Sequence, residues 1–178
     1  MPRINRGIFF VLFFIKDQIN MDNQHQEYMR MAIELSVQNV SESIGGPFGA
    51  VVVKDGKLIA KSANKVTATN DPTAHAEVSA IRLACTELNT FDLSGCVIYT
   101  SCEPCPMCLG AIYWSRIDTI YYANTKADAE HIGFSDKFIY EELDKPMENR
   151  SLPVIQLMRD EALAAFKLWE TSPMRIEY

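Results

Sequence analysis

The sequence predicts an α/β protein, a three-layer αβα sandwich in which helices cover both faces of a mixed five-stranded sheet. Three observations predict this fold. Short runs rich in β-branched and aromatic residues alternate with segments of helical periodicity along most of the chain. The pair Asp55-Gly56 joins the first two runs, and Asp-Gly is a strong signal for a tight hairpin. Beyond the hairpin, helix and strand alternate, which is typical of a sheet packed between helices.

Each element has its own signal. Apolar residues recur at helical spacing over residues 22–40, which predicts an amphipathic helix. Strands are expected at residues 50–54, 58–64, 95–101, 118–124 and 153–157. Further helices are expected at residues 72–85, 104–114 and 160–170. Asp71 is a favourable cap for the second helix, with Pro72 at its first position.

Length and charge narrow the class of protein. The chain has 178 residues, enough for one domain with a substantial core. Its 17 basic and 23 acidic residues give a formal net charge of −6. Because a phosphate backbone is held by clustered Lys and Arg, we expect no nucleic-acid partner.

The first twenty residues differ from the rest of the chain. Arg3 and Arg6 precede an apolar run at residues 8–15, which resembles a short signal segment. The run is shorter than the about 20 apolar residues that span a bilayer, and no small-residue cleavage site follows it. We therefore expect residues 1–20 to be an extension upstream of a start at Met21. Residues 21–178 would form one domain without a membrane partner, ending in a helix and tail at residues 158–178.

The cysteines indicate a metal site. The chain has five, and three of them, Cys102, Cys105 and Cys108, lie within seven residues. A secreted disulfide scaffold is usually smaller, with its cysteines spread over loops. Crowded cysteines in a chain of this size favour metal ligation in a reducing compartment, so a cytoplasmic location is expected.

His75, Cys105 and Cys108 form a candidate zinc site. The two cysteines lie three residues apart at a predicted helix start, so both sulfurs can face one ion. His75 lies near the start of another predicted helix. One nitrogen and two sulfurs suit a catalytic Zn²⁺ whose fourth position holds water, and the ion lowers the pKa of that water towards ~7. Glu77 would then lie beside the water as a proton carrier, and His-x-Glu followed by Pro-Cys-x-x-Cys is the zinc deaminase signature.

Other interpretations remain open for single residues. A lone His or Glu at a helix start is usually a surface or capping residue, whereas the combination favours zinc. Cys102 extends the pattern to C-x₂-C-x₂-C, as in iron–sulfur proteins, but the fourth cysteine of such a run is missing. We therefore expect Cys102 to line the cavity without binding the metal. Cys85 and Cys96 are expected to be small buried hydrophobes.

The quoted motifs also resemble a known family, the cytidine deaminase-like zinc deaminases. The matching stretches are "GGPFGAVVVKDG", "NDPTAHAEVSAIR", "YTSCEPCPMCLGAIYWSRI", "GFSDKFIYEE" and the closing Tyr. They extend over residues 21–178. Within the family, "GGPFGA", "AIYW" and "GFSDKFIY" are most similar to the short bacterial guanine deaminases.

This resemblance implies a role for each matching position. The metal ligands would be His75, Cys105 and Cys108, and the catalytic residues would be Glu77 and Asp136. Residues that bind the purine would be Phe48, Asn64, Ala76, Trp114 and Tyr178. The resemblance further implies a homodimer in which the C-terminal segments are exchanged, so that Tyr178 closes the active site of the partner. On sequence alone, Phe48 and Trp114 could also belong to the core, Asn64 is as well suited to a turn, and Asp136 could be an ordinary loop residue.

The predicted function is hydrolysis of guanine to xanthine and ammonia with one Zn²⁺ per subunit. Within enzymes the alternatives are a guanosine deaminase and a tRNA-specific adenosine deaminase. A third alternative is a zinc-stabilised binding module without catalysis. Such a module would have no use for Glu77, which binds no metal in this interpretation.

Overall fold

The structure of the protein, a computed structural model, describes the backbone of residues 6–178 and the side chains of residues 21–178. The first helix, α1 (Arg6–Ser41), begins earlier than the predicted residue 22 and ends close to the predicted residue 40. The predicted extension, residues 1–20, lies outside the described side chains and stays a prediction. Among the residues that the structure describes, no helix is long and apolar enough to cross a membrane.

The sheet has four strands in the order β2-β1-β3-β4. They are β1 (Gly49–Lys54), β2 (Lys57–Ala63), β3 (Cys96–Cys102) and β4 (Thr119–Asn124). β1 pairs antiparallel with β2 and β3, whereas β3 and β4 are parallel, so the sheet is mixed as predicted. The predicted hairpin is confirmed: Asp55 and Gly56 have φ angles of 50° and 67°, as a tight two-residue turn requires.

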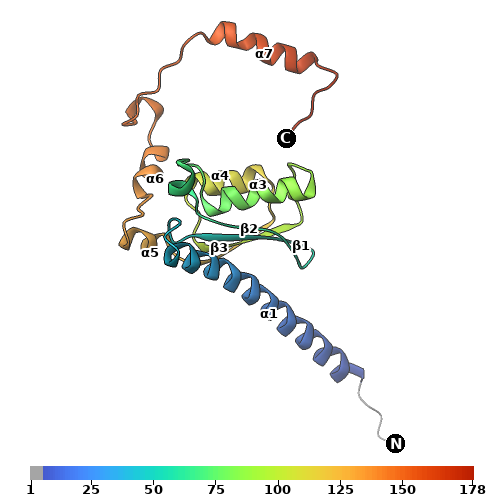
Figure 1. The fold of residues 1–178 in the computed structure, drawn as a ribbon. Coiled ribbons are helices and arrows are strands. Elements are labelled where there is room, and N and C mark those ends of the chain that lie inside the picture. Colours follow the sequence, from blue (N-terminus) through green and yellow to red (C-terminus); the bar gives the residue numbers. More distant parts are fainter. Residues whose placement is uncertain (1–5) are drawn as a thin grey trace, which may run out of the picture.

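The predicted fifth strand is wrong. Residues 153–157 have no strand structure, and the side chain of Ile155 is 84% exposed. A run with strand-forming composition becomes a strand only where a sheet edge offers backbone partners. The chain leaves the body of the protein before this segment, so no edge lies beside it (Figure 1).

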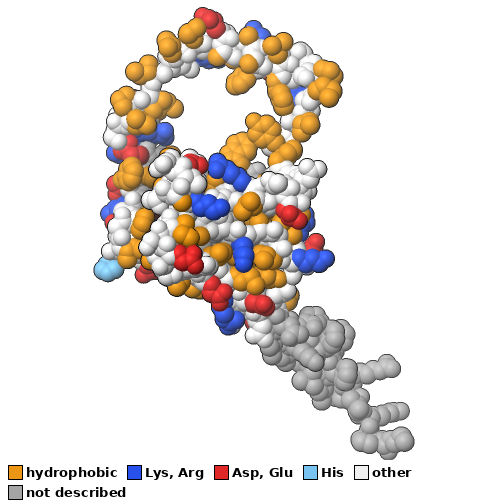
Figure 2. All heavy atoms as spheres, viewed as in Figure 1, with side chains coloured by type: hydrophobic (Ala, Val, Ile, Leu, Met, Phe, Trp, Pro, Cys, Tyr) orange, Lys and Arg blue, Asp and Glu red, His pale blue; other side chains and the backbone are white. Residues whose placement is uncertain are grey.

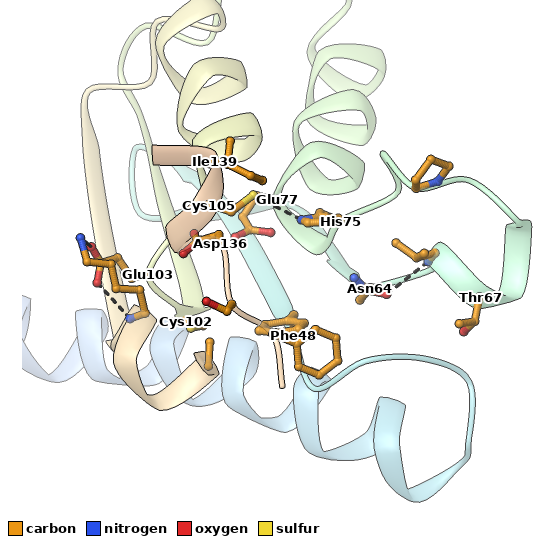
Figure 3. A pocket seen from close by; sticks show the side chains of 16 residues that line it. Phe48, Asn64, Thr67, His75, Glu77, Cys102, Glu103, Cys105, Asp136 and Ile139 are labelled. Atoms are coloured by element: carbon orange, nitrogen blue, oxygen red, sulfur yellow. Dashed lines mark hydrogen bonds and ion pairs between the residues drawn. The ribbon is translucent and has the colours of Figure 1, made fainter. Parts of the chain in front are cut away.

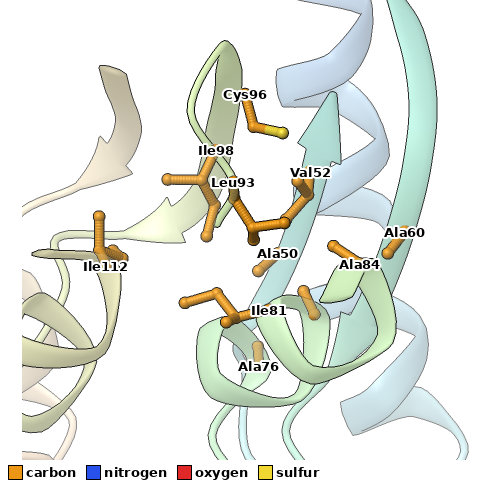
Figure 4. Packing of buried hydrophobic residues seen from close by; sticks show 11 residues of the cluster. Ala50, Val52, Ala60, Ala76, Ile81, Ala84, Leu93, Cys96, Ile98 and Ile112 are labelled. Atoms are coloured by element: carbon orange, nitrogen blue, oxygen red, sulfur yellow. The ribbon is translucent and has the colours of Figure 1, made fainter. Parts of the chain in front are cut away.

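Helices cover both faces of the sheet, as predicted (Figure 1). α1 packs on one face, where Tyr28, Ala32 and Tyr99 are buried beside two residues of β1, Val51 and Val53. On the other face lie α3 (Ala76–Leu88) and α4 (Pro106–Trp114). Their buried residues meet the opposite side of β1 in a second cluster (Figure 4), which contains Ala50, Val52, Ala60, Ala76, Ala80, Ile81, Ala84, Leu93, Cys96, Ile98 and Ile112. The alternation along β1 thus divides the core in two.

The helix that carries His75 and Glu77 begins later than predicted. Asp71 does not cap it: the Asp71 side chain instead accepts hydrogen bonds from the backbone nitrogen and the hydroxyl of Thr73, at 2.8 and 2.7 Å. This local turn competes with helix formation, so α3 starts only at Ala76 and His75 takes the capping position. Glu77 is the second residue of the helix.

Small elements that periodicity did not predict surround one end of the sheet. They are α2 (Val66–Thr69), α5 (Lys126–His131), α6 (Lys137–Asp144) and a 3₁₀ turn at Met147–Asn149. Each is too short to show a clear helical repeat in sequence. α5 is held by a capping box in which Thr125 and Asp128 bond each other's backbone nitrogen.

Residues 151–178 form an extended arm, and the C-terminal helix α7 (Arg159–Thr171) lies on it, away from the body of the protein (Figure 1). Hydrophobic side chains occur along this arm (Figure 2). Its large exposed apolar residues are Leu152, Val154, Ile155, Leu157, Met158, Phe166, Leu168, Trp169, Met174 and Ile176. The predicted exchange of this segment between subunits stays a prediction.

Candidate active site

The three predicted metal ligands come together at the starts of two helices. His75 and Cys105 occupy the N-cap positions of α3 and α4 with extended backbone angles, and neither side chain bonds the backbone of its helix as a cap, so both stay available as ligands. Cys108 lies three residues after Cys105, on the first turn of α4. Pro106 supplies the first residue of α4, where its missing N–H is not needed. The donor atoms of the three side chains all lie within 4.8 Å of one another.

The spacing of the donor atoms fits zinc. His75 Nδ1 lies 3.5 Å from Cys105 Sγ and 3.4 Å from Cys108 Sγ. Tetrahedral zinc with ordinary Zn–N and Zn–S bonds holds a nitrogen and a sulfur about 3.5–3.6 Å apart. The observed separations match this value, so the three side chains are already placed to hold the ion. One nitrogen and two sulfurs also form a donor set that zinc accepts at catalytic sites.

Proton sharing among the ligands supports the same assignment. A hydrogen bond with the Cys108 thiol lowers the pKa of Cys105 to about 4 and raises the pKa of Cys108 itself. The pKa of His75 is raised, chiefly by its hydrogen bond with Cys105. Cys105 is therefore readily available as a thiolate, the form that binds metal. A divalent cation would take the place of the shared protons.

Glu77 lies next to the ligands but is not one of them. Its side chain is only 6% exposed, and its carboxylate accepts a hydrogen bond from the Thr100 hydroxyl at 3.4 Å. Burial raises the pKa of Glu77. A carboxyl group with a raised pKa can take up a proton and give it back, which is what a general acid/base must do.

The metal site opens into a cavity of about 330 Å³ (Figure 3). This volume lies at the small end of ligand-binding pockets, which measure about 300–1,000 Å³. The lining residues are Phe48, Asn64, Val66, Thr67, Pro72, His75, Glu77, Cys102, Glu103, Cys105, Lys126, Ala129, Phe134, Ser135, Asp136 and Ile139. A small flat molecule held there would lie against the metal ligands and Glu77.

Two predicted purine-binding residues form one wall of the cavity. Asn64 follows β2 and is buried; its side-chain oxygen accepts the Val66 N–H at 3.2 Å, which leaves its amide nitrogen free to donate. Phe48 precedes β1, and its ring meets Phe134 edge to face, with 5.0 Å between the ring centroids. The wall thus presents an aromatic face and a hydrogen-bond donor.

Asp136 reaches the cavity from the start of α6, close to Cys105 and Glu77 in Figure 3. Burial raises the pKa of its carboxyl group. Cys102 lines the cavity, as predicted, and does not belong to the group of metal-binding donors. Cys96 is fully buried and Cys85 partly so, in keeping with their predicted packing roles.

The other predicted binding residues lie elsewhere in this chain. Trp114, at the end of α4, is 69% exposed and lies outside the cavity. Tyr178 is 71% exposed and lies against Trp114 and Phe91, with 6.2 and 6.4 Å between ring centroids. Ala76 is buried in the core at the first position of α3 and does not line the cavity. The predicted roles of these three residues stay predictions.

Sequence reasoning missed several lining residues. Phe134 lies two residues before Asp136 and could have been found from that neighbour. Glu103 follows Cys102 and accepts a hydrogen bond from the Lys126 backbone nitrogen at 3.1 Å. Lys126 had no local signal, because its place in the wall depends on how α5 packs beside the end of β3.

The fold and the site together define a class of protein. The family model for the cytidine and deoxycytidylate deaminase zinc-binding region matches residues 22–124, more than half of the chain, and the chain belongs to this family. A guanine deaminase from Bacillus subtilis is 51% identical over 154 residues, which are 86% of this chain and 99% of that protein. Its crystal structure superposes with a TM-score of 0.84 and covers 86% of this chain and 98% of the other.

Two further relatives are less similar to this chain than the Bacillus subtilis protein. A tRNA-specific adenosine deaminase from Aquifex aeolicus is 43% identical over 103 residues, 58% of this chain and 66% of that protein. A guanine deaminase structure from Nitrosomonas europaea has a TM-score of 0.59 at 36% identity, covering 79% of this chain and 81% of the other. The zinc-binding region is therefore similar to deaminases with different substrates.

Proposed function

We propose that this protein is a zinc-dependent guanine deaminase, which converts guanine and water to xanthine and ammonia. The observation that carries the proposal is the extent of the likeness to the Bacillus subtilis enzyme. A single stretch covering 154 of 178 residues necessarily includes Asp136, beyond the zinc-binding region that ends at Asn124. The likeness therefore covers the cavity as well as the metal ligands.

The proposed pocket holds guanine through its faces and one edge. Phe48 would pack against a face of the flat ring, with Phe134 supporting it from the side. The free amide nitrogen of Asn64 would donate to an acceptor on the base, and guanine carries two acceptors, O6 and N7, on one edge. Such contacts fix the ring so that C2, which bears the amino group, faces the metal ligands.

The chemistry divides between the metal and Glu77. His75, Cys105 and Cys108 would hold the zinc, which when bound would supply a Lewis acid that makes water nucleophilic near neutral pH. Glu77 takes a proton from the attacking water and delivers it to ring N3 as oxygen bonds to C2. Its burial keeps bulk water from competing for that proton.

Loss of ammonia needs a second proton transfer. The amino group leaves only once its nitrogen has gained a proton, and Glu77 and Asp136 both have carboxyl groups on the cavity. Burial raises the pKa of Asp136, which makes its carboxyl group a better proton carrier than an exposed aspartate. As the C–N bond breaks, the C2 hydroxyl returns its proton to the carboxylate that protonated the amino group, and ammonia and the C2 carbonyl of xanthine form.

The test is conversion of guanine by the zinc-loaded protein, followed by ultraviolet absorbance. Guanosine, adenine, cytidine and a tRNA anticodon hairpin serve as parallel substrates. We expect turnover of guanine and little or none of the RNA, because a chain of net charge −6 lacks the cations that hold a phosphate backbone. Inert guanine beside a reactive nucleoside or RNA would overturn the substrate assignment and retain the zinc chemistry.

We further propose that the active protein is a cytoplasmic homodimer with exchanged C-terminal segments. The arm carries exposed apolar residues that a second copy of the chain would cover in such a dimer. Exchange would bring Tyr178 of one subunit to the cavity of the other as a lid. Light scattering should then give twice the 20.1 kDa mass of the chain.

Removing Tyr178 tests the lid. We expect the truncated protein to keep its melting temperature and its mass in solution, because the exposed tyrosine contributes little packing. Guanine turnover should nevertheless fall, because an open site admits water and holds the base loosely. Unchanged kcat and KM in the truncated protein would rule out the lid.

A further inference from the structure

Asn39, near the end of α1, is a buried polar residue outside the cavity. Its side chain is only 3% exposed, and it does not line the site. The middle of α1 packs on the sheet through an apolar cluster, and the other polar contacts of the helix, from His25 to Tyr99 and from Tyr28 to the Gly56 carbonyl, lie nearer its start. A buried amide is costly unless its hydrogen bonds are made, so the partners of Asn39 indicate what it does.

One hydrogen-bond partner of Asn39 is Asn64, which lines the cavity, and the other is Gly46, two residues before the cavity residue Phe48. The Asn39 amide nitrogen donates to the carbonyl oxygens of Gly46 and Asn64, at 2.8 and 2.9 Å. Because both partners can only accept, the nitrogen of the amide, not its oxygen, must face them. One side chain thus joins the loop before β1 to the residue that follows β2.

Backbone hydrogen bonds close the same network. The Asn39 carbonyl accepts the N–H groups of Ile44 and Gly45, at 3.0 and 3.3 Å. On the other side, the Asn64 N–H donates to the Phe48 carbonyl at 2.9 Å. The backbones of Phe48 and Asn64 are therefore tied to each other, and Asn39 connects the pair to α1.

Gly45 fills the space beside this network. A Cβ atom at Gly45 would lie 2.7 Å from the Asn64 carbonyl oxygen and 2.9 Å from the Asn39 amide nitrogen. Both distances are too short for real contacts, so a side chain here would displace one of the two groups. The absence of a side chain at Gly45 lets Asn39 approach Asn64.

We propose that Asn39 is a positioning residue for substrate recognition, which holds Phe48 and Asn64 in register as one unit. The proposal rests on the proposed function, because it assigns those two residues to guanine binding. Asn39 touches neither the metal ligands nor Glu77. It acts on how the base is held, so its loss should affect KM more than kcat.

Asn39→Asp tests the proposal with almost no change in shape. A carboxylate cannot donate, and it would place negative charge against two carbonyl oxygens. We expect KM for guanine to rise on the order of tenfold with a smaller change in kcat and an unchanged zinc content. Ser36→Ala is the matched control, because Ser36 is also buried on α1 but its hydroxyl bonds the Ile33 carbonyl within the same helix. Its kinetics should stay at the wild-type level.

A double-mutant cycle separates positioning from general destabilisation. In an Asn64→Ala background the amide that Asn39 positions is gone, so Asn39→Asp should cost markedly less in kcat/KM than it does in the wild type. Equal costs in both backgrounds would overturn the proposal. Gly45→Ala offers an independent variant, and we expect it to reproduce the rise in KM while Asn39 itself is intact.

Hydrogen exchange gives a readout that needs no activity. The backbone N–H of Asn64, which donates to the Phe48 carbonyl, should exchange its hydrogen faster in Asn39→Asp than in the wild type or in Ser36→Ala. Unchanged exchange at Asn64 would refute the positioning role. If the wild type fails to deaminate guanine, the proposed function fails, whereas the exchange experiment still decides what Asn39 holds in place.

Discussion

Glu77→Gln is expected to lower guanine turnover by about 10²–10⁴-fold, the usual contribution of a general acid/base. The amide has nearly the same shape and can keep the contact with Thr100, but it cannot take up or return a proton. The transfer from the attacking water to ring N3 would therefore fail, and only Asp136 would remain to protonate the leaving amino group. The measurement is the steady-state rate with guanine, with metal content determined on the same sample.

The metal content is what makes this variant informative. Glu77 is not part of the group of metal-binding donors, so Glu77→Gln should retain zinc at the wild-type level. Loss of activity with zinc retained would also separate an enzyme from a zinc-stabilised binding module, which has no need of a proton carrier. Equal turnover in the two proteins would refute the role assigned to Glu77.

Cys105→Ala is expected to abolish zinc binding and activity together. The substitution removes one of three protein ligands, and it removes the thiolate whose pKa lies at about 4. Because zinc binds the folded state, its loss should also lower the thermal midpoint of unfolding. Metal analysis, turnover and a melting curve on one preparation test all three effects.

Cys102→Ala is the matched control for the metal site. Cys102 lies on the same cavity, but its sulfur is within 3.5 Å of the Thr125 carbonyl and lies outside the group of metal-binding donors. Burial raises the pKa of Cys102 to about 11, so its sulfur stays a neutral thiol. We expect this variant to keep its zinc. Loss of metal from Cys102→Ala would instead favour the alternative in which all three clustered cysteines bind the ion.

Local spacing was enough to predict the metal ligands. His75, Cys105 and Cys108 lie at helix starts, where short stretches of sequence determine both the direction of the chain and the chemistry of the side chains. The position of Glu77 beside the metal ligands was predictable for the same reason, because it lies only two residues after His75. The hairpin at Asp55-Gly56 was predictable for a similar reason, because a two-residue turn depends almost entirely on its own residues.

Competition between local signals explains the errors at element ends. Asp71 is a good helix cap in isolation, but Thr73 offers it a nearer partner and delays the helix. Residues 153–157 have the composition of a strand, but strand pairing needs an edge that only the folded chain or a partner can supply. The sheet therefore has four strands and not the five that were predicted.

The sequence by itself determined the class of chemistry, because a metal site made of closely spaced ligands on helix starts is nearly a local structure. The resemblance of the sequence to known deaminases also implied site roles for Phe48, Asn64 and Asp136. Residue type alone could not distinguish these three from ordinary core, turn and loop residues. Only the tertiary structure brought these three from separate elements to one cavity with the metal ligands. Only the tertiary structure identified the buried Asn39 amide that bonds the backbone of Asn64. A hydrogen bond between residues 25 positions apart leaves no periodic pattern in the sequence.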